Sequence, residues 1–124
     1  MRMRSKRFAD AVVITSSGRL DHENSNAFGN GIGPILADAA TSKSGIVLDF
    51  SELEYISSAG LRALMLAANQ AKSQGVKIVV ASLQPVVSEI FQISRFNMVF
   101  SIFGTLRDAL AEISTDAAAA FDRG

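Results

Sequence analysis

The sequence of 124 residues predicts one α/β domain with a mixed, mostly parallel sheet of four to five strands and about four helices. Short β-branched apolar runs alternate along the chain with longer stretches whose apolar residues recur every three or four positions. Helical crossovers between successive strands produce parallel pairing. The length fits a single domain, so we expect it to span 1–124, with its core at about 10–113.

The first predicted strand lies within residues 1–9, where Met and Arg alternate with the period of a half-exposed edge strand. A basic arm for nucleic acid is the alternative for this segment. The turn at Ala9 and Asp10 leads into the β-branched run 11–15, which predicts an antiparallel hairpin. Later strands are predicted at 46–48, 76–81 and 99–103, with 49–51 as a turn that closes the first of them.

The first helix is predicted to begin at Asn24 or Ser25, both of which are good capping residues. Its apolar stripe consists of Phe28, Ile32, Ile35, Leu36 and Ala39. The glycines at 29, 31 and 33 each cost about 1 kcal/mol relative to alanine, and Pro34 removes a hydrogen bond. We therefore expect a kink, or a late start near Pro34.

A second helix is predicted after Ser57 and Ser58, ending at a left-handed Gly75. Its predicted apolar stripe is Leu61, Leu64, Met65 and Ala68. The third helix should begin with Pro85 and end near Arg95, using Val86, Val87, Ile90 and Phe91 as its apolar face.

Thr105 and Asp108 form a capping pair for a last helix. The apolar face of that helix is predicted to be Leu106, Ala109, Leu110 and Ile113. The alanine-rich tail at 114–124 is expected to fray.

The composition limits the classes of partner. Twelve basic and twelve acidic residues give a net charge of zero, so no overall field attracts the chain to nucleic acid or to an anionic membrane. The absence of cysteine excludes disulfides and fits a reducing compartment. No run is long enough to cross a bilayer or to act as a secretory signal. We expect a cytoplasmic protein that binds neither nucleic acid nor membrane directly.

The inventory of reactive residues argues against an enzyme. His22 is the only histidine, and no GxSxG motif surrounds Ser58. The acidic residues Asp49, Glu52 and Glu54 lack the spacing of a calcium loop. We therefore expect no catalytic residues, no cofactor and no metal. A small hydrolase that uses Ser58 and His22 is the alternative, and His22→Ala would abolish its esterase activity.

The serine pair at 57–58 is the most informative feature of the chain, because it marks the point at which a strand leads into a helix. Ligands and partners meet open parallel sheets at the carboxyl ends of strands. A serine at such a place can also act simply as an N-cap, which stabilises a helix by about 1 kcal/mol. Spacing alone does not choose between a regulatory hydroxyl and a cap.

From Val12 to Ile113 the chain resembles the STAS domain of bacterial anti-sigma factor antagonists. The resemblance rests on the Gly18-Arg19-Leu20-Asp21 element and on Asp49-Phe50-Ser51 followed by the run from Tyr55 to Leu61. In that family the serine two places before the glycine is phosphorylated by an anti-sigma factor that is itself a kinase. By resemblance the acceptor is Ser58, with Ser57 as second choice because Ser57 replaces a common aspartate.

The resemblance implies a cycle of partner exchange. The unmodified protein binds the anti-sigma factor kinase, frees the sigma factor, and is released after phosphorylation; a serine phosphatase resets it. The expected partner surface consists of Asp21, Ser57, Ser58, Ala59, Gly60 and Arg62. The alternative is a STAS scaffold subunit, without phosphorylation, in a signalling or lipid-transport complex.

Overall fold

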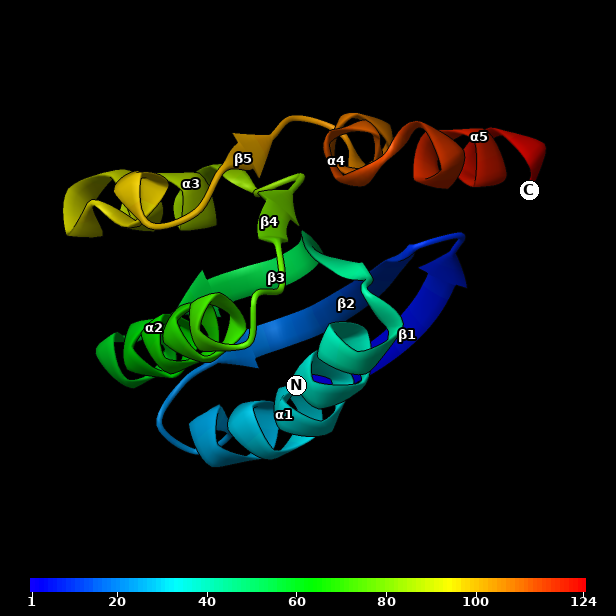
Figure 1. The fold of residues 1–124 in the computed structure, drawn as a ribbon. Helices are drawn as coiled ribbons and strands as arrows, with labels where there is room; N and C mark the ends of the chain where they lie inside the picture. Colours follow the sequence, from blue (N-terminus) through cyan, green and yellow to red (C-terminus); the bar gives the residue numbers. More distant parts are fainter.

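The computed structural model describes residues 1–124 as a five-stranded sheet between layers of helices (Figure 1). The strands, in their order across the sheet, are β1 (Arg2–Phe8), β2 (Ala11–Leu20), β3 (Gly45–Ile56), β4 (Ile78–Ala81) and β5 (Ile102–Phe103). Only the β1–β2 pair is antiparallel. The predicted mixed, mostly parallel sheet is therefore confirmed.

Five α-helices are present, one more than expected. They are α1 (Ser25–Ser42), α2 (Ser58–Ser73), α3 (Pro85–Ser94), α4 (Leu106–Ile113) and α5 (Thr115–Arg123), with a short 3-10 helix at Phe96–Met98. Figure 1 shows α1 and α2 on one side of the sheet and α4 and α5 on the other.

Alternate residues of the central strands supply two separate cores, because neighbouring side chains on a strand point to opposite faces. The larger core joins the sheet to α1, α2 and α3; its members include Ile14, Leu48, Phe28, Leu64 and Phe91. The smaller core joins the sheet to α4 and α5; its members include Val13, Val47, Val79, Ala109 and Leu110. Both faces of the central strands are thus covered, as their continuous apolar runs indicate.

The two central strands are longer than predicted. β2 continues beyond residue 15 to Leu20, and β3 continues through the expected turn at 49–51 to Ile56. The Asp49 carboxylate accepts bonds from the Ser51 backbone N–H at 3.0 Å and the Thr15 hydroxyl at 3.2 Å. These bonds let a buried aspartate remain inside the sheet, where the β2–β3 pairing shifts register after Thr15. The turn-forming residues 49–51 therefore accompany a register shift within the strand and do not end β3.

The first helix is continuous from Ser25, so the predicted late start near Pro34 is wrong. Phe28 and Ile32 before the proline, and Leu36 and Ala39 after it, are all buried against the sheet. This burial on both sides of Pro34 outweighs the missing hydrogen bond and the low helix propensity of the glycines.

The apolar face of α2 is centred differently from the prediction. Leu64 is buried as expected, whereas Leu61, Met65 and Ala68 are only half-buried. The residues packed deepest beside Leu64 are small ones: Gly60, Ala63, Ala67 and Ala71. In α3, Val87 and Phe91 are buried, but Val86 is 53% exposed. Because alanine and glycine are only weakly hydrophobic, a hydropathy pattern does not predict that these small residues of α2 are buried.

Several predicted helix ends are confirmed. Gly75 is left-handed just beyond α2, and Pro85 begins α3, which ends at Ser94 before a left-handed Arg95. The Thr105 hydroxyl accepts the Asp108 backbone N–H at 3.1 Å.

Two predictions for the C-terminal third of the chain are wrong. The strand predicted at 99–103 is reduced to β5, because Phe100 turns into the larger core and follows the 3-10 helix. The tail does not fray but forms α5, capped by the Ser114 hydroxyl at the Ala117 N–H. Phe121 packs edge-on against Phe8 with ring centroids 5.5 Å apart. A tertiary contact thus anchors a helix whose own sequence shows little apolar pattern.

Candidate functional site

Ser57 serves as the N-cap of α2. Its backbone is extended, and its hydroxyl oxygen accepts the Gly60 backbone N–H at 3.2 Å. The Ser57 backbone N–H donates to the Leu20 carbonyl oxygen at 2.9 Å, which ties the start of the helix to the end of β2. The Ser57 side chain is half-buried and is already used by the fold.

Ser58 is the first residue of α2 and is exposed to solvent. Its hydroxyl makes no hydrogen bond, in contrast to that of Ser57. The expected strand-to-helix position of the pair is therefore present, and the two hydroxyls differ: one caps the helix, and the other is free.

Gly60 sets the distance between α2 and the end of β2. A Cβ atom at this position would lie 2.3 Å from the Leu20 carbonyl oxygen and 2.9 Å from the Ile56 side chain. Only a residue without a side chain allows the first turn of α2 to sit this close. Gly60 is buried and positions the serines, so it offers the surface no side chain.

The loop that follows β2 lies beside the first turn of α2 and is held by its own hydrogen bonds. The Asn24 amide oxygen accepts the Asp21 backbone N–H at 2.8 Å, and its amide nitrogen donates to the Arg19 carbonyl at 2.5 Å. The Asp21 carboxylate accepts the Glu23 N–H at 3.1 Å. Asn24 therefore occupies the predicted cap position of α1, but its side chain fixes the loop and does not cap the helix.

A hollow of about 260 Å³ separates this loop and the start of α1 from α2. Its walls are His22, Ser25 and Asn26 on one side and Ala59, Arg62 and Ala63 on the other. Arg62 is exposed and forms no ion pair. Two predicted contact residues, Ala59 and Arg62, thus line one depression, and Asp21 directly precedes its His22 wall.

One feature beside the serines was not foreseen. Arg19 and Tyr55 face each other across β2 and β3, and the Arg19 guanidinium lies over the Tyr55 ring at 4.4 Å from its centroid. The guanidinium Nε also lies 3.8 Å from the Asp21 carboxylate. The proximity of Arg19 to Asp21 in the sequence was a signal, but the pairing with Tyr55 depends on the β2–β3 register.

The site contains no arrangement typical of a hydrolase or a metal centre. No hydrogen bond joins the His22 imidazole to Ser57 or Ser58; the Ser25 hydroxyl contacts only the His22 carbonyl, at 3.5 Å. No three side chains from His, Cys, Asp and Glu gather in a geometry that could hold a metal ion. None of the helices combines the length and hydropathy that a membrane span requires. What the geometry offers is an exposed hydroxyl beside a fixed loop and an unpaired cation.

The family model described as the STAS domain matches residues 2–109. The chain belongs to the STAS domain family. This STAS domain is 40% identical over 70 residues to BtrV of Bordetella bronchiseptica, which is provisionally named an anti-sigma factor antagonist; the match covers 56% of the chain and 60% of the relative. It is 29% identical over 102 residues to the anti-sigma-F factor antagonist RsfB of Mycobacterium tuberculosis, covering 82% of the chain and 80% of RsfB.

Solved structures share the fold. An anti-sigma factor antagonist from Mycobacterium paratuberculosis superposes on this STAS domain with a TM-score of 0.79 at 22% identity, covering 90% of the chain and 92% of that structure. The antagonist SpoIIAA superposes in its unphosphorylated form with a TM-score of 0.65 at 14% identity, and in its phosphorylated form with 0.63 at 17%. Those matches cover 90% of the chain and 96% and 99% of the two SpoIIAA structures.

Proposed function

We propose that this protein is an anti-sigma factor antagonist that binds an anti-sigma factor with serine kinase activity while Ser58 is unmodified. Binding releases the sigma factor, and phosphorylation of Ser58 ends the complex until a serine phosphatase removes the phosphate. The observation that carries this proposal is the free, exposed Ser58 hydroxyl on the first turn of α2. The antagonists among its relatives support the same function.

The geometry favours Ser58 over Ser57 as the acceptor. A kinase needs the hydroxyl oxygen to approach its nucleotide, and the Ser57 oxygen is occupied by the Gly60 N–H. Phosphorylation of Ser57 would also disturb the cap, which stabilises the helix by about 1 kcal/mol. Modification of Ser58 removes no hydrogen bond from the fold.

The domain itself should tolerate the phosphate. A phosphoserine adds about −1.5 to −2 charges at neutral pH, and a helix N-terminus favours negative charge by about 0.3 to 1 kcal/mol. Arg62 lies four residues further along α2 and shares the face of Ser58, so its unpaired guanidinium can approach the phosphate. The phosphorylated SpoIIAA structure, which retains this fold, supports the same conclusion.

The complex with the anti-sigma factor, in contrast, should not tolerate a phosphate on Ser58. If Ser58 is covered by the partner, an unpaired doubly charged group must be desolvated, at a cost of several kcal/mol. A cost of about 4 kcal/mol corresponds to a roughly thousandfold weaker complex. Because this exceeds the stabilisation from the helix N-terminus, the phosphate changes affinity much more than it changes stability.

The rest of the proposed interface surrounds Ser58. Ala59 and Arg62 line one wall of the hollow, and Asp21, which is opposite in charge to Arg62, directly precedes the His22 wall in the sequence. Charges placed in this way specify the partner and its orientation more than they add affinity. Ser57 and Gly60 act beneath this surface, by holding the first turn of α2 in place.

The test begins with incubation with the kinase and ATP, followed by mass mapping of the modified residue. Ser58→Ala should stay folded and bind tightly, whereas Ser58→Asp should stay folded and bind weakly in calorimetry. Thr115→Asp is the matched control, because Thr115 is the exposed first residue of α5 on the other side of the sheet. Equal affinity of the two Ser58 variants would remove Ser58 from the mechanism. Absence of phosphate from both Ser57 and Ser58 would favour the scaffold function.

A further inference from the structure

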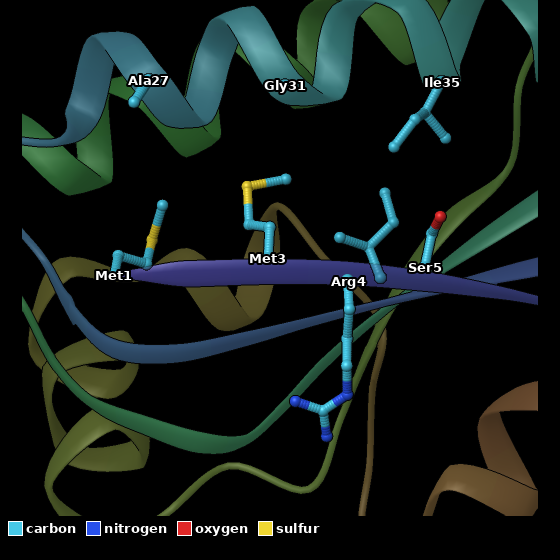
Figure 2. Close-up of a pocket in the computed structure, with 8 residues that line it drawn as sticks. Met1, Met3, Arg4, Ser5, Ala27, Gly31 and Ile35 are labelled. Carbon is cyan, nitrogen blue, oxygen red and sulfur yellow. The ribbon is translucent and has the colours of Figure 1, made fainter.

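A groove runs between β1 and α1, and it shares no lining residue with the hollow beside the serine site. Its first part, about 330 Å³, lies between Met1 and the β1 residue Met3 on one side and the α1 residues Ala27, Gly31 and Ile35 on the other (Figure 2). Its second part, about 370 Å³, continues past Arg7 and Pro34 to Asp38. Both parts share Ser5 and Ile35, so they form one elongated depression along the strand, which we call the β1–α1 groove.

The first part of the groove is apolar and remains open because of a glycine. Figure 2 shows Met1 and Met3 pointing toward α1, with Gly31 opposite Met3, while Arg4 points away to the other face. Ala27, Gly31 and Ile35 follow one another at four-residue intervals and therefore share one face of the helix. A Cβ at Gly31 would lie 3.3 Å from the Met3 Cε atom, so a larger side chain there would fill the space.

The strand beside the groove is the free edge of the sheet. β1 pairs only with β2, and no other element adds a strand on its outer side (Figure 1). A strand edge exposes a row of unpaired N–H and C=O groups that can accept another extended chain. Side chains of such an added strand alternate, so every second one would face the β1–α1 groove.

The charge of this edge restricts what can be added. The strand sequence RMRSKRF contains four cations and no acid. Arg4 is paired with Glu52 at 2.5 Å and Arg7 with Asp38 at 3.7 Å, whereas Arg2 and Lys6 form no ion pair. Like charges opposite each other destabilise strand pairs, so a second copy of this chain is disfavoured at the edge. An acidic strand is complementary to it.

We propose that the β1 edge and the β1–α1 groove bind an extended segment of a partner protein in which apolar and acidic residues alternate. The apolar side chains enter the groove beside Met3 and Gly31. The acidic side chains lie on the opposite face of the added strand, near Arg2 and Lys6. The main chain supplies affinity through hydrogen bonds to β1, and the alternation supplies specificity. This surface is separate from Ser58.

The probe is a capped peptide of about seven residues that alternates Glu and Val, matched to the length of β1. Its counterpart alternates Lys and Val. Fluorescence anisotropy should show at least about tenfold tighter binding of the acidic peptide. Hydrogen exchange followed by NMR should show slower exchange of the outward-facing amides of β1 when the acidic peptide is bound, and no change at α2.

Two glycine variants test the groove. Gly31→Leu fills it and raises helix propensity, so the domain stays folded and peptide binding falls about tenfold. Gly29→Leu is the control, because no atom lies within 4 Å of a Cβ built there; binding should be unchanged.

A charge exchange tests the cationic face. The double variant Arg2→Glu and Lys6→Glu should reverse the preference toward the basic peptide, and Ser58→Asp should leave both affinities unchanged. The proposal is overturned if the acidic peptide binds no tighter than the basic one, if Gly31→Leu binds as well as Gly29→Leu, or if slowed exchange appears outside β1. Dimerisation of the chain through β1 in NMR relaxation or sedimentation would also overturn it.

Discussion

A single methyl group at Gly60 should displace the serine site. In Gly60→Ala the new Cβ would lie 2.3 Å from the Leu20 carbonyl oxygen, which belongs to the backbone of β2 and cannot rotate away. The first turn of α2 must therefore move outward. Such overpacking costs about 2 kcal/mol, and loss of the bond from the Ser57 N–H to Leu20 costs about 1 kcal/mol more.

The gain in helix propensity, about 1 kcal/mol, offsets part of this loss. The net expectation is a decrease of about 2 kcal/mol in the free energy of unfolding, equivalent to a Tm lower by about 8 °C. Urea and thermal unfolding, each followed by circular dichroism, measure the free energy of unfolding and the Tm. Gly29→Ala is the control, since open space surrounds that position and the substitution should stabilise by about 1 kcal/mol. If Gly60→Ala unfolds at the same urea concentration as the parent, the close approach of α2 to β2 is not what requires glycine.

Three smaller changes test other parts of the fold. Ser57→Ala should lower the free energy of unfolding by about 1 kcal/mol, and Ser57→Asp should retain the cap; urea midpoints that fail to separate the two would contradict the capping role. Ser16→Ala should raise stability by about 1 kcal/mol in the same assay, because the Ser16 hydroxyl is buried without a hydrogen-bond partner. The Arg107 guanidinium lowers the pKa of the Asp122 carboxyl, so their pair stabilises the fold above the ordinary carboxyl pKa and loses this effect as the pH falls through the lowered pKa. Asp122→Asn should therefore be less stable than the parent at neutral pH, and the difference should shrink below about pH 4; an unchanged difference would refute it.

Sequence patterns predicted the elements whose stability is local or strongly apolar. The β-branched run of β2, the proline that begins α3 and the Thr105 cap needed no knowledge of their neighbours. The missed elements depend on distant residues. Asp49 remains in β3 because the hydroxyl of Thr15 in the neighbouring strand donates a hydrogen bond to its carboxylate. Helix α5 is held in place because Phe121 packs against Phe8 of β1.

The features of the candidate site also differ in whether they could be predicted from adjacent residues. The place of Ser57 and Ser58 at a helix start follows from adjacent residues, and so does the polar loop at Asp21. The requirement for glycine at 60 could not be derived, because it comes from a carbonyl of β2 that the fold brings within reach. Spacing also could not tell which serine hydroxyl would be occupied by the cap, since either residue could have begun the helix.

The contact between Phe8 and Phe121 has a consequence for biosynthesis. The ribosome makes β1 before it makes α5, the helix that covers one face of this strand. Until α5 has emerged, Phe8 on the nascent hairpin lacks its final cover. The nascent hairpin therefore exposes an apolar patch at Phe8 that is covered only after α5 has been made and has docked.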